Sequence, residues 1–388
     1  MEQPIFQIFF LVFSGGALLA SIALFGRQPL LVAYIALGAL IGPHGLGWVT
    51  DVQLISDIST IGIAFLLFLL GLDMQPQALL RVLREVTHIS LFSSLLFGLL
   101  GLLVAYLFNY SPIECLIIGA SMMFSSTIIG IKLLPTTALH HKHSGELMVG
   151  MLLMQDFLAI FVLLVLLSVG KTGGSAIDFG ISLIALPLLF GGAILLVRYL
   201  LQPLFTRFDR MGEYVFLLAI GWCMGVAEVA EIVGLSREVG AFIAGISLAT
   251  SPIAQYIALN LKPLRDFFLI LFFFSLGGGF DLSLLPEVAL PAAVLAIAML
   301  AIKPVTYRYL LRSHSERNDL SWDIGFRLGQ NSEFSLLIAY MAFNLQLIGN
   351  NASHLIQAAA IITFLISSYI VVFNFPNPIA VSDKLRRD

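Results

Sequence analysis

The sequence contains very little charge. Of its 388 residues, 11% are Asp, Glu, Lys or Arg, whereas 59% are hydrophobic and the mean hydropathy is +0.99. Soluble domains carry about 25% charged residues, so this composition excludes a soluble globular protein and indicates a membrane protein with many spans. The formal net charge of -3 is small, which argues against a nucleic-acid partner.

Cysteines are also few, and no basic segment precedes the first apolar run. Cys115 and Cys223 both lie in apolar segments, so no disulfide is expected. The first apolar run follows Glu2, has no basic residue before it and lacks a small-residue cleavage site. We therefore expect it to be a retained first span and not a removable signal peptide.

Long apolar runs dominate what remains. A helix needs roughly 20 apolar residues to cross the hydrocarbon core of a bilayer. This length predicts an all-α polytopic membrane protein with about thirteen transmembrane helices, which form a single domain over residues 1–388. The expected spans are 5–25, 29–43, 55–72, 87–108, 112–133, 146–169, 178–200, 213–233, 236–252, 266–280, 288–311, 322–344 and 352–373.

Basic residues alternate between the loops that join these spans. One set of alternate loops contains sixteen of the 20 Lys and Arg residues, and the other contains only Lys171 and Arg237. Lys303 and Arg327 fall within spans. Because cytoplasmic loops carry an excess of Lys and Arg, we expect an outside N-terminus and a cytoplasmic C-terminus in a multi-pass protein of the inner (plasma) membrane.

The second half of the sequence resembles the first at an offset near 208 residues. Three pairs of segments carry the similarity: 33–36 with 241–244, Asp73 with Asp281, and 125–127 with 333–335. This offset moves the span number by seven, an odd number, so the copies have opposite orientation. We expect inverted repeats over approximately 1–170 and 213–375, joined by a linking helix at 178–200, as in many secondary transporters.

Two expected spans contain polar residues at mid-depth. The span 112–133 contains Ser125-Ser126-Thr127, and a later span contains Gly329-Gln330-Asn331-Ser332. Backbone can unwind at this depth only where it is buried in protein or lines a cavity. We therefore expect two crossed broken helices whose half-helix ends face each other.

One carboxylate stands in the middle of an apolar run. Asp156 follows Gln155 there, and an ionised carboxylate in hydrocarbon costs several kcal/mol, so such residues are usually functional. Burial disfavours the charged form, so Asp156 could take up a proton. It could alternatively bind a dehydrated monovalent cation, Na⁺ or K⁺, together with oxygens from Gln155, Ser125, Ser126 and Thr127. Competition of a proton and a cation for one anion produces exchange.

Three further charged residues support this site. Lys303 and Glu333 could balance the partial charges of the half-helix ends, since helix N-termini are partly positive and C-termini partly negative. Lys303 could alternatively pair with Asp156 or take part in transport. Glu333 is expected to be structural, with Arg327 or Lys303 as its partner. A purely structural pair of Asp156 and Lys303 is the alternative interpretation.

These motifs resemble the monovalent cation:proton antiporter-2 family, and within it the membrane part of the glutathione-gated potassium-efflux (Kef) antiporters. The resemblance rests on the segments Leu67–Asp73, Phe124–Thr127, Gln155–Asp156, Gly240–Gly245 and Gly329–Phe334. It implies a dimeric, thirteen-helix, inverted-repeat fold with a dimerisation domain and a moving core domain. It also implies that Asp156 binds the ion or the proton.

The sequence differs from the Kef pattern in two respects. It extends only a short way past the last span, so we expect no cytosolic regulatory domain, although an unidentified cytosolic subunit could supply one. The segment Tyr256–Pro263 lacks the acidic cluster of the Kef regulatory loop, so glutathione gating is not expected.

The leading interpretation is an antiporter that exchanges a monovalent cation for H⁺ without a cofactor. The resemblance favours K⁺ over Na⁺, and one acid beside Gln155 suggests electroneutral exchange, unless Lys303 also carries a proton. A Na⁺-coupled symporter would need a roomier polar cavity, and a cation channel would not need a titratable carboxylate. An intramembrane hydrolase would need a second catalytic group that the spans lack, so we expect no enzyme.

Overall fold

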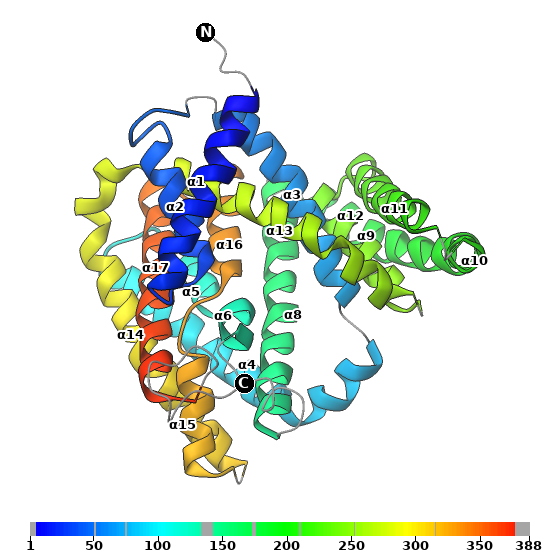
Figure 1. The fold of residues 1–388 in the computed structure, drawn as a ribbon. Coiled ribbons are helices and arrows are strands. Elements are labelled where there is room, and N and C mark those ends of the chain that lie inside the picture. The colour runs from blue at the N-terminus through cyan, green and yellow to red at the C-terminus, as the bar shows by residue number, and fades with distance from the viewer. Residues whose placement is uncertain are drawn as a thin grey trace.

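The computed structural model describes residues 5–49, 52–73, 76–132, 143–172, 176–208, 211–251, 253–314 and 316–376, and all regular secondary structure in these ranges is helical (Figure 1). The first half contains α1 (Ile5–Phe25), α2 (Leu30–Ile41), α3 (Val52–Asp73), α4 (Pro76–Leu107), α5 (Pro112–Met122), α6 (Thr127–Lys132) and α8 (His143–Thr172). The second half contains α11 (Gly212–Ile232), α12 (Arg237–Ala249), α13 (Ala254–Gly278), η2 (Leu282–Leu284), α14 (Leu285–Ser313), α15 (Asn318–Arg327), α16 (Glu333–Asn344) and α17 (Asn350–Asn374).

The two halves are joined by an almost continuous helical segment. It consists of α9 (Ala176–Leu196), the π-helix η1 (Val197–Leu201) and α10 (Gln202–Arg207), so it extends beyond the predicted linking helix 178–200. Within the described residues, seven helices are individually long and apolar enough to cross a bilayer, and three shorter apolar helices accompany them. The multi-span, all-helical prediction is confirmed, and the number of thirteen spans stays a prediction.

The order of helices repeats between the halves. Each of the seven helices α11 to α17 begins 202 to 209 residues after its counterpart in the series α1 to α6 and α8. The starts of α6 and α16 make Thr127 and Glu333 counterparts. The helices therefore match 125–127 with 331–333, two residues earlier than the sequence similarity predicted. The register between the two halves is therefore set by the residues at which the helices begin, and the short polar motif does not indicate it.

Helix packing exchanges partners between the halves in a symmetric way. Helix α2 packs on α13, and its counterpart α12 packs on α3. At the first contact a Cβ on Gly38 would lie 2.0 Å from the carbonyl oxygen of Phe274, and at the second a Cβ on Gly245 would lie 2.0 Å from that of Phe68. Only glycine permits backbones to approach this closely. Such reciprocal contacts are what a two-fold relation between the halves produces.

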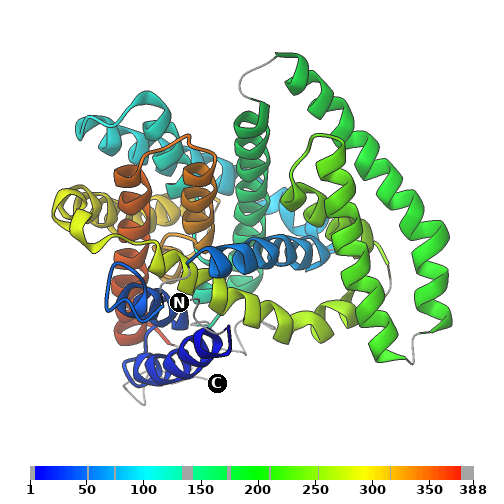
Figure 2. The same cartoon turned by 90° about the horizontal axis from the view of Figure 1, so that it is seen from above.

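The contacts divide the described helices into two groups. The first, here called the scaffold group, contains α1, α2, α3, α11, α12 and α13. The second, here called the site group, contains α4, α5, α6, α8 and α14 to α17. In Figures 1 and 2 the linking segment and α11 lie on the side of the molecule away from α14 and α17. Both broken helices belong to the site group.

Candidate functional site

Two helix interruptions form the centre of the site group. Helix α5 ends at Met122 and α6 begins at Thr127, and we call residues 123–126 the first break. Helix α15 ends at Arg327 and α16 begins at Glu333, and residues 328–332 are the second break. Both interruptions overlap the polar clusters that the sequence indicated.

A serine starts the helix that follows each break. Ser126 Oγ accepts a hydrogen bond from the Ile129 N–H at 3.1 Å, and Ser332 Oγ accepts one from the Phe334 N–H at 3.1 Å. Such caps satisfy backbone donors that a helix N-terminus leaves without an intrahelical partner. Serine in both polar clusters therefore explains why each new helix can begin inside an apolar interior.

Lys303 joins the two breaks. Its Nζ donates to the carbonyl oxygen of Phe124 at 2.6 Å and to that of Gln330 at 3.0 Å. These carbonyls follow the C-terminal ends of α5 and α15, where the helix dipoles are partly negative. The Lys303 side chain is completely buried, and its Nζ lies 5.3 Å from the ring centroid of Phe97. Of the roles expected for Lys303, the geometry matches the half-helix partner, and no ion pair joins it to Asp156 among the described residues.

Asp156 lies at the opposite kind of helix end. Its carboxylate is only 3% exposed and accepts hydrogen bonds from Thr127 Oγ1, at 3.1 Å to Oδ1 and 3.0 Å to Oδ2. Thr127 is the first residue of α6, whose N-terminus is partly positive. Glu333, the first residue of α16, is close enough to interact electrostatically with Asp156. The site therefore has its carboxylates at helix N-termini and its ammonium group at helix C-termini.

Gln155 and Ser125 hold the first break in place. Gln155 Oε1 accepts the Ser125 N–H at 3.0 Å, and Gln155 Nε2 donates to the Tyr307 hydroxyl. Ser125 Oγ donates to the Leu328 carbonyl oxygen of the second break at 2.7 Å. Of the four residues expected to share a cation with Asp156, Thr127 is therefore the one in direct contact with the carboxylate, because Ser125, Ser126 and Gln155 use polar atoms to build the break.

Tyr307 is the site residue that sequence reasoning missed. It is completely buried on α14, one helical turn after Lys303. That spacing places both side chains on one face of the helix. A polar atom one turn from an intramembrane lysine was the available signal, although an aromatic residue in an apolar run more often belongs to the core.

Arg327 lies at the edge of the site. Its Nε is 2.8 Å from Asp323 Oδ1, one turn earlier on α15, and its guanidinium also donates to the Pro376 carbonyl oxygen at 2.7 Å. The side chain thus ties the end of α15 to the segment after α17. The sequence analysis named Glu333 as an expected partner of Arg327, and the structure adds Asp323, an i,i+4 neighbour on α15.

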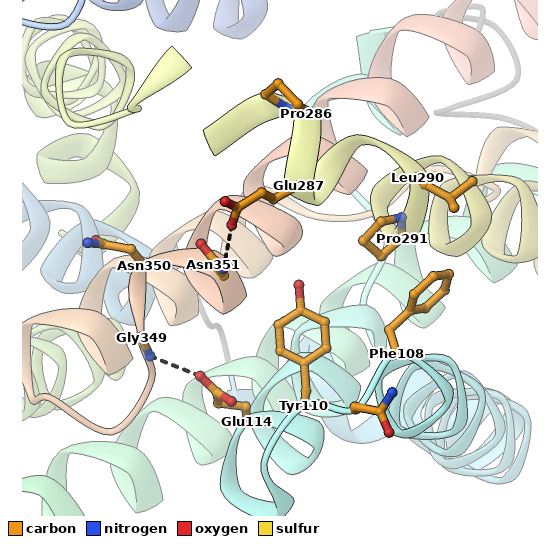
Figure 3. Close-up of a pocket in the computed structure, with 11 residues that line it drawn as sticks. Phe108, Tyr110, Glu114, Pro286, Glu287, Leu290, Pro291, Gly349, Asn350 and Asn351 are labelled. Carbon is orange, nitrogen blue, oxygen red and sulfur yellow. Dashed lines mark hydrogen bonds between the residues drawn. The ribbon is translucent and has the colours of Figure 1, made fainter. Parts of the chain in front are cut away.

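A hollow of about 710 Å³ opens at the other end of α5, where α14 and α17 begin (Figure 3). Glu114 accepts the Gly349 N–H at 3.1 Å, and Glu287 accepts from Asn351 Nδ2 at 3.0 Å. Asp156 contacts the start of α6, beyond the C-terminal end of α5. A helix rises about 1.5 Å per residue, so the length of α5 separates this hollow from the carboxylate.

Comparison with known proteins gives two findings. Residues 9–374 match the family described as "Sodium/hydrogen exchanger, transmembrane". K(+) efflux antiporter 4 of Arabidopsis thaliana is 32% identical over 338 residues, which cover 83% of this chain and 55% of the relative. The chain therefore spans about half the length of this curated relative.

Proposed function

Because this chain belongs to the sodium/hydrogen exchanger family, we propose that it is a secondary active antiporter that exchanges a monovalent cation for H⁺ at Asp156. The family and the apolar helices make the chain a multi-pass membrane protein. A family of exchangers also agrees with the expectation that the chain is not an enzyme. The observation that carries the proposal is a nearly inaccessible carboxylate that one threonine hydroxyl holds at the N-terminus of a broken helix.

Electrostatics support competition at this carboxylate. An ionised Asp156 is disfavoured by its apolar surroundings and by the nearby charge of Glu333. A proton or a cation relieves both effects, and each occupies the same anionic oxygens. The Thr127 hydroxyl can turn its oxygen toward a bound cation, since a hydroxyl is both donor and acceptor. With a proton or a cation bound, Asp156 is neutralised and the site can move across the membrane. With Asp156 as a bare anion, the uncompensated charge opposes this movement.

The other charges of the site favour electroneutral exchange. The Lys303 ammonium is engaged by two backbone carbonyls, which suits a fixed electrostatic role and not a carrier role. Gln155 adds no charge beside Asp156. If the protonation state of Glu333 does not change during the transport cycle, one proton is exchanged for one cation. Movement of the site group against the scaffold group would give elevator-type alternating access.

The identity of the cation and the assembly are parts of the same proposal. The relative's name, K(+) efflux antiporter 4, supports K⁺ as the cation. Homodimer formation, a plasma-membrane location with a cytoplasmic C-terminus and a cytosolic regulatory subunit stay predictions.

Proteoliposomes loaded with a pH-sensitive dye test the function. With an imposed proton gradient, adding K⁺ should change the internal pH of vesicles that contain the wild-type protein, and Asp156→Asn should abolish the change while the protein still folds. Na⁺, Li⁺ and Rb⁺ in parallel determine selectivity, and a membrane-potential dye distinguishes electroneutral from electrogenic exchange. Normal proton-coupled exchange by Asp156→Asn would exclude the assignment, and single-channel currents would indicate a channel.

A further inference from the structure

The hydroxyl of Tyr307 lies where three polar side chains from different parts of the site meet. It accepts the hydrogen bond from Gln155 Nε2 on α8 and lies 3.4 Å from Ser125 Oγ in the first break. Ser93 of α4 also reaches it with its side chain. Tyr307 thus connects α4, α8, α14 and the first break through a single oxygen atom.

This junction fixes the orientation of the Gln155 amide. A side-chain amide has one acceptor end and one donor end, and its two ends must match their partners. The backbone N–H of Ser125 requires the oxygen of Gln155, and the Tyr307 hydroxyl offers an acceptor to the nitrogen. Without the hydroxyl the nitrogen loses this partner, and a rotated amide would no longer hold the Ser125 N–H.

The orientation of the Gln155 amide affects the ion site because Gln155 and its partner Ser125 are close in sequence to the residues of that site. Gln155 directly precedes Asp156 on α8, and Ser125 lies two residues before Thr127. The hydrogen bond between Gln155 and Ser125 therefore fixes α8 against the start of α6, the arrangement in which Thr127 meets both oxygens of Asp156.

We propose that Tyr307 is a positioning residue for cation exchange, which acts through Gln155 to hold Thr127 at the carboxylate of Asp156. The inference rests on the proposed function, because it concerns the geometry of the same carboxylate. It assigns Gln155 an indirect role, since both ends of its amide serve the first break.

Tyr307→Phe tests the hydroxyl alone. The ring and its edge-on contact with Phe97, at 5.4 Å between centroids, are kept, and only the oxygen is removed. Tyr369→Phe is the matched control, because Tyr369 is 42% exposed on α17 and stacks on Phe373. In the proteoliposome assay, the apparent KM for the transported cation should rise about fivefold in Tyr307→Phe, the effect of losing roughly one buried hydrogen bond. The maximal rate should stay within about twofold, and Tyr369→Phe should behave as the wild type.

A double-mutant cycle separates positioning from general stabilisation. If Tyr307 acts through Gln155, Gln155→Ala alone and Gln155→Ala combined with Tyr307→Phe should have the same apparent KM. If Tyr307 acted independently of Gln155, Tyr307→Phe would raise the apparent KM by the same factor with and without Gln155→Ala. Such multiplicative effects would overturn the inference. A normal KM in Tyr307→Phe would overturn it as well.

The same assay distinguishes failure of this inference from failure of the proposed function. Exchange by the wild-type protein and none by Asp156→Asn support the function, and a wild-type result for Tyr307→Phe then overturns the positioning role alone. Absence of exchange by the wild-type protein in every cation would overturn both.

Discussion

The two breaks share one construction. Each follows the C-terminal end of a short helix, and each precedes a helix that a serine caps, Ser126 in the first break and Ser332 in the second. Lys303 donates to one carbonyl in each, and these carbonyls belong to the counterpart residues Phe124 and Gln330. The polypeptide therefore builds the same helix interruption twice, and one ammonium group donates to both copies.

The breaks differ in where their acid lies. In the first half the broken helix begins with Thr127, and the acid, Asp156, lies on the long helix α8. In the second half the broken helix begins with Glu333, and Thr363 of α17 occupies the position of Asp156, as counted from the helix starts. Acid and hydroxyl have exchanged places between the two halves.

Because acid and hydroxyl are swapped, we expect only the first half to bind a ligand. Thr363 Oγ1 accepts the Asn331 N–H at 3.0 Å, and Gln330 Oε1 accepts from Ser367 at 2.9 Å, so the second break is held by internal hydrogen bonds. In the first break the carboxylate of Asp156 accepts hydrogen bonds only from the hydroxyl of Thr127 among the described residues, and that hydroxyl can turn its oxygen toward a bound cation. We therefore expect the first break to provide the binding site and the second break to be structural.

The strongest challenge to this comparison is to disrupt the same position in each half. We expect Asp156→Asn to abolish exchange and its counterpart Thr363→Val to retain exchange with a lower thermal stability, because the Asn331 N–H loses its acceptor. Loss of a partner for a buried donor costs about 1–3 kcal/mol. Vesicle assays and thermal unfolding in detergent measure the two effects. Equal loss of exchange in both variants would show that the two halves share the ion.

Removal of the shared charge should weaken both breaks at once. Lys303→Met leaves the carbonyls of Phe124 and Gln330 without their donor, so we expect a loss of about 3 kcal/mol in stability, whereas Lys303→Gln should lose less because its amide can still donate to one carbonyl. Thermal unfolding of the purified variants measures this order. Lys262→Met, an exposed lysine on α13, is the control. The same stability in Lys303→Met and Lys262→Met would refute the joining role.

Thr127 provides a finer test of the first break. Thr127→Val removes the hydroxyl and keeps the shape, so the apparent KM for the cation should rise about tenfold, in line with a hydrogen bond to a charged group of roughly 1.5 kcal/mol. Thr127→Ser, which keeps the hydroxyl, should restore most of the affinity. Cation titrations in proteoliposomes measure both, and a serine variant as weak as the valine variant would contradict the role of the hydroxyl.

Sequence alone located the breaks and the central charges. Polar clusters in apolar spans placed both interruptions, and one of the roles considered for Lys303, a partner of half-helix ends, agrees with its contacts with the carbonyls of Phe124 and Gln330. Spacing along one helix could not determine what crosses from another, so the contact of Thr127 with Asp156 and the engagement of Gln155 by Tyr307 emerged only from the structure. The side chain of Asp73, matched with Asp281 in the repeat, lies outside the described residues.

The smallest expected effect concerns a further asymmetry at the far end of α5. The carboxylate of Glu114 accepts the backbone N–H of Ser111 at 3.0 Å and that of Gly349 at 3.1 Å, so it caps α5 and links this end of α5 to the start of α17. The counterpart position in α15 is Leu320, which offers no acceptor, so only the first half has this link to the start of α17.

Both hydrogen bonds are strongest when Glu114 is an ionised carboxylate, so they stabilise the folded state while Glu114 is ionised and weaken when acid protonates it. Glu114→Gln should therefore lower the free energy of unfolding at pH 7 by about 1 kcal/mol, the amount typical of one helix cap, and so have a lower Tm than the wild type. The difference should shrink on acidification, because only the wild type loses a charge. Thermal unfolding at several pH values measures it, and a difference that is constant or grows toward acid would mean that the carboxylate of Glu114 does not join α5 to α17 in the folded protein.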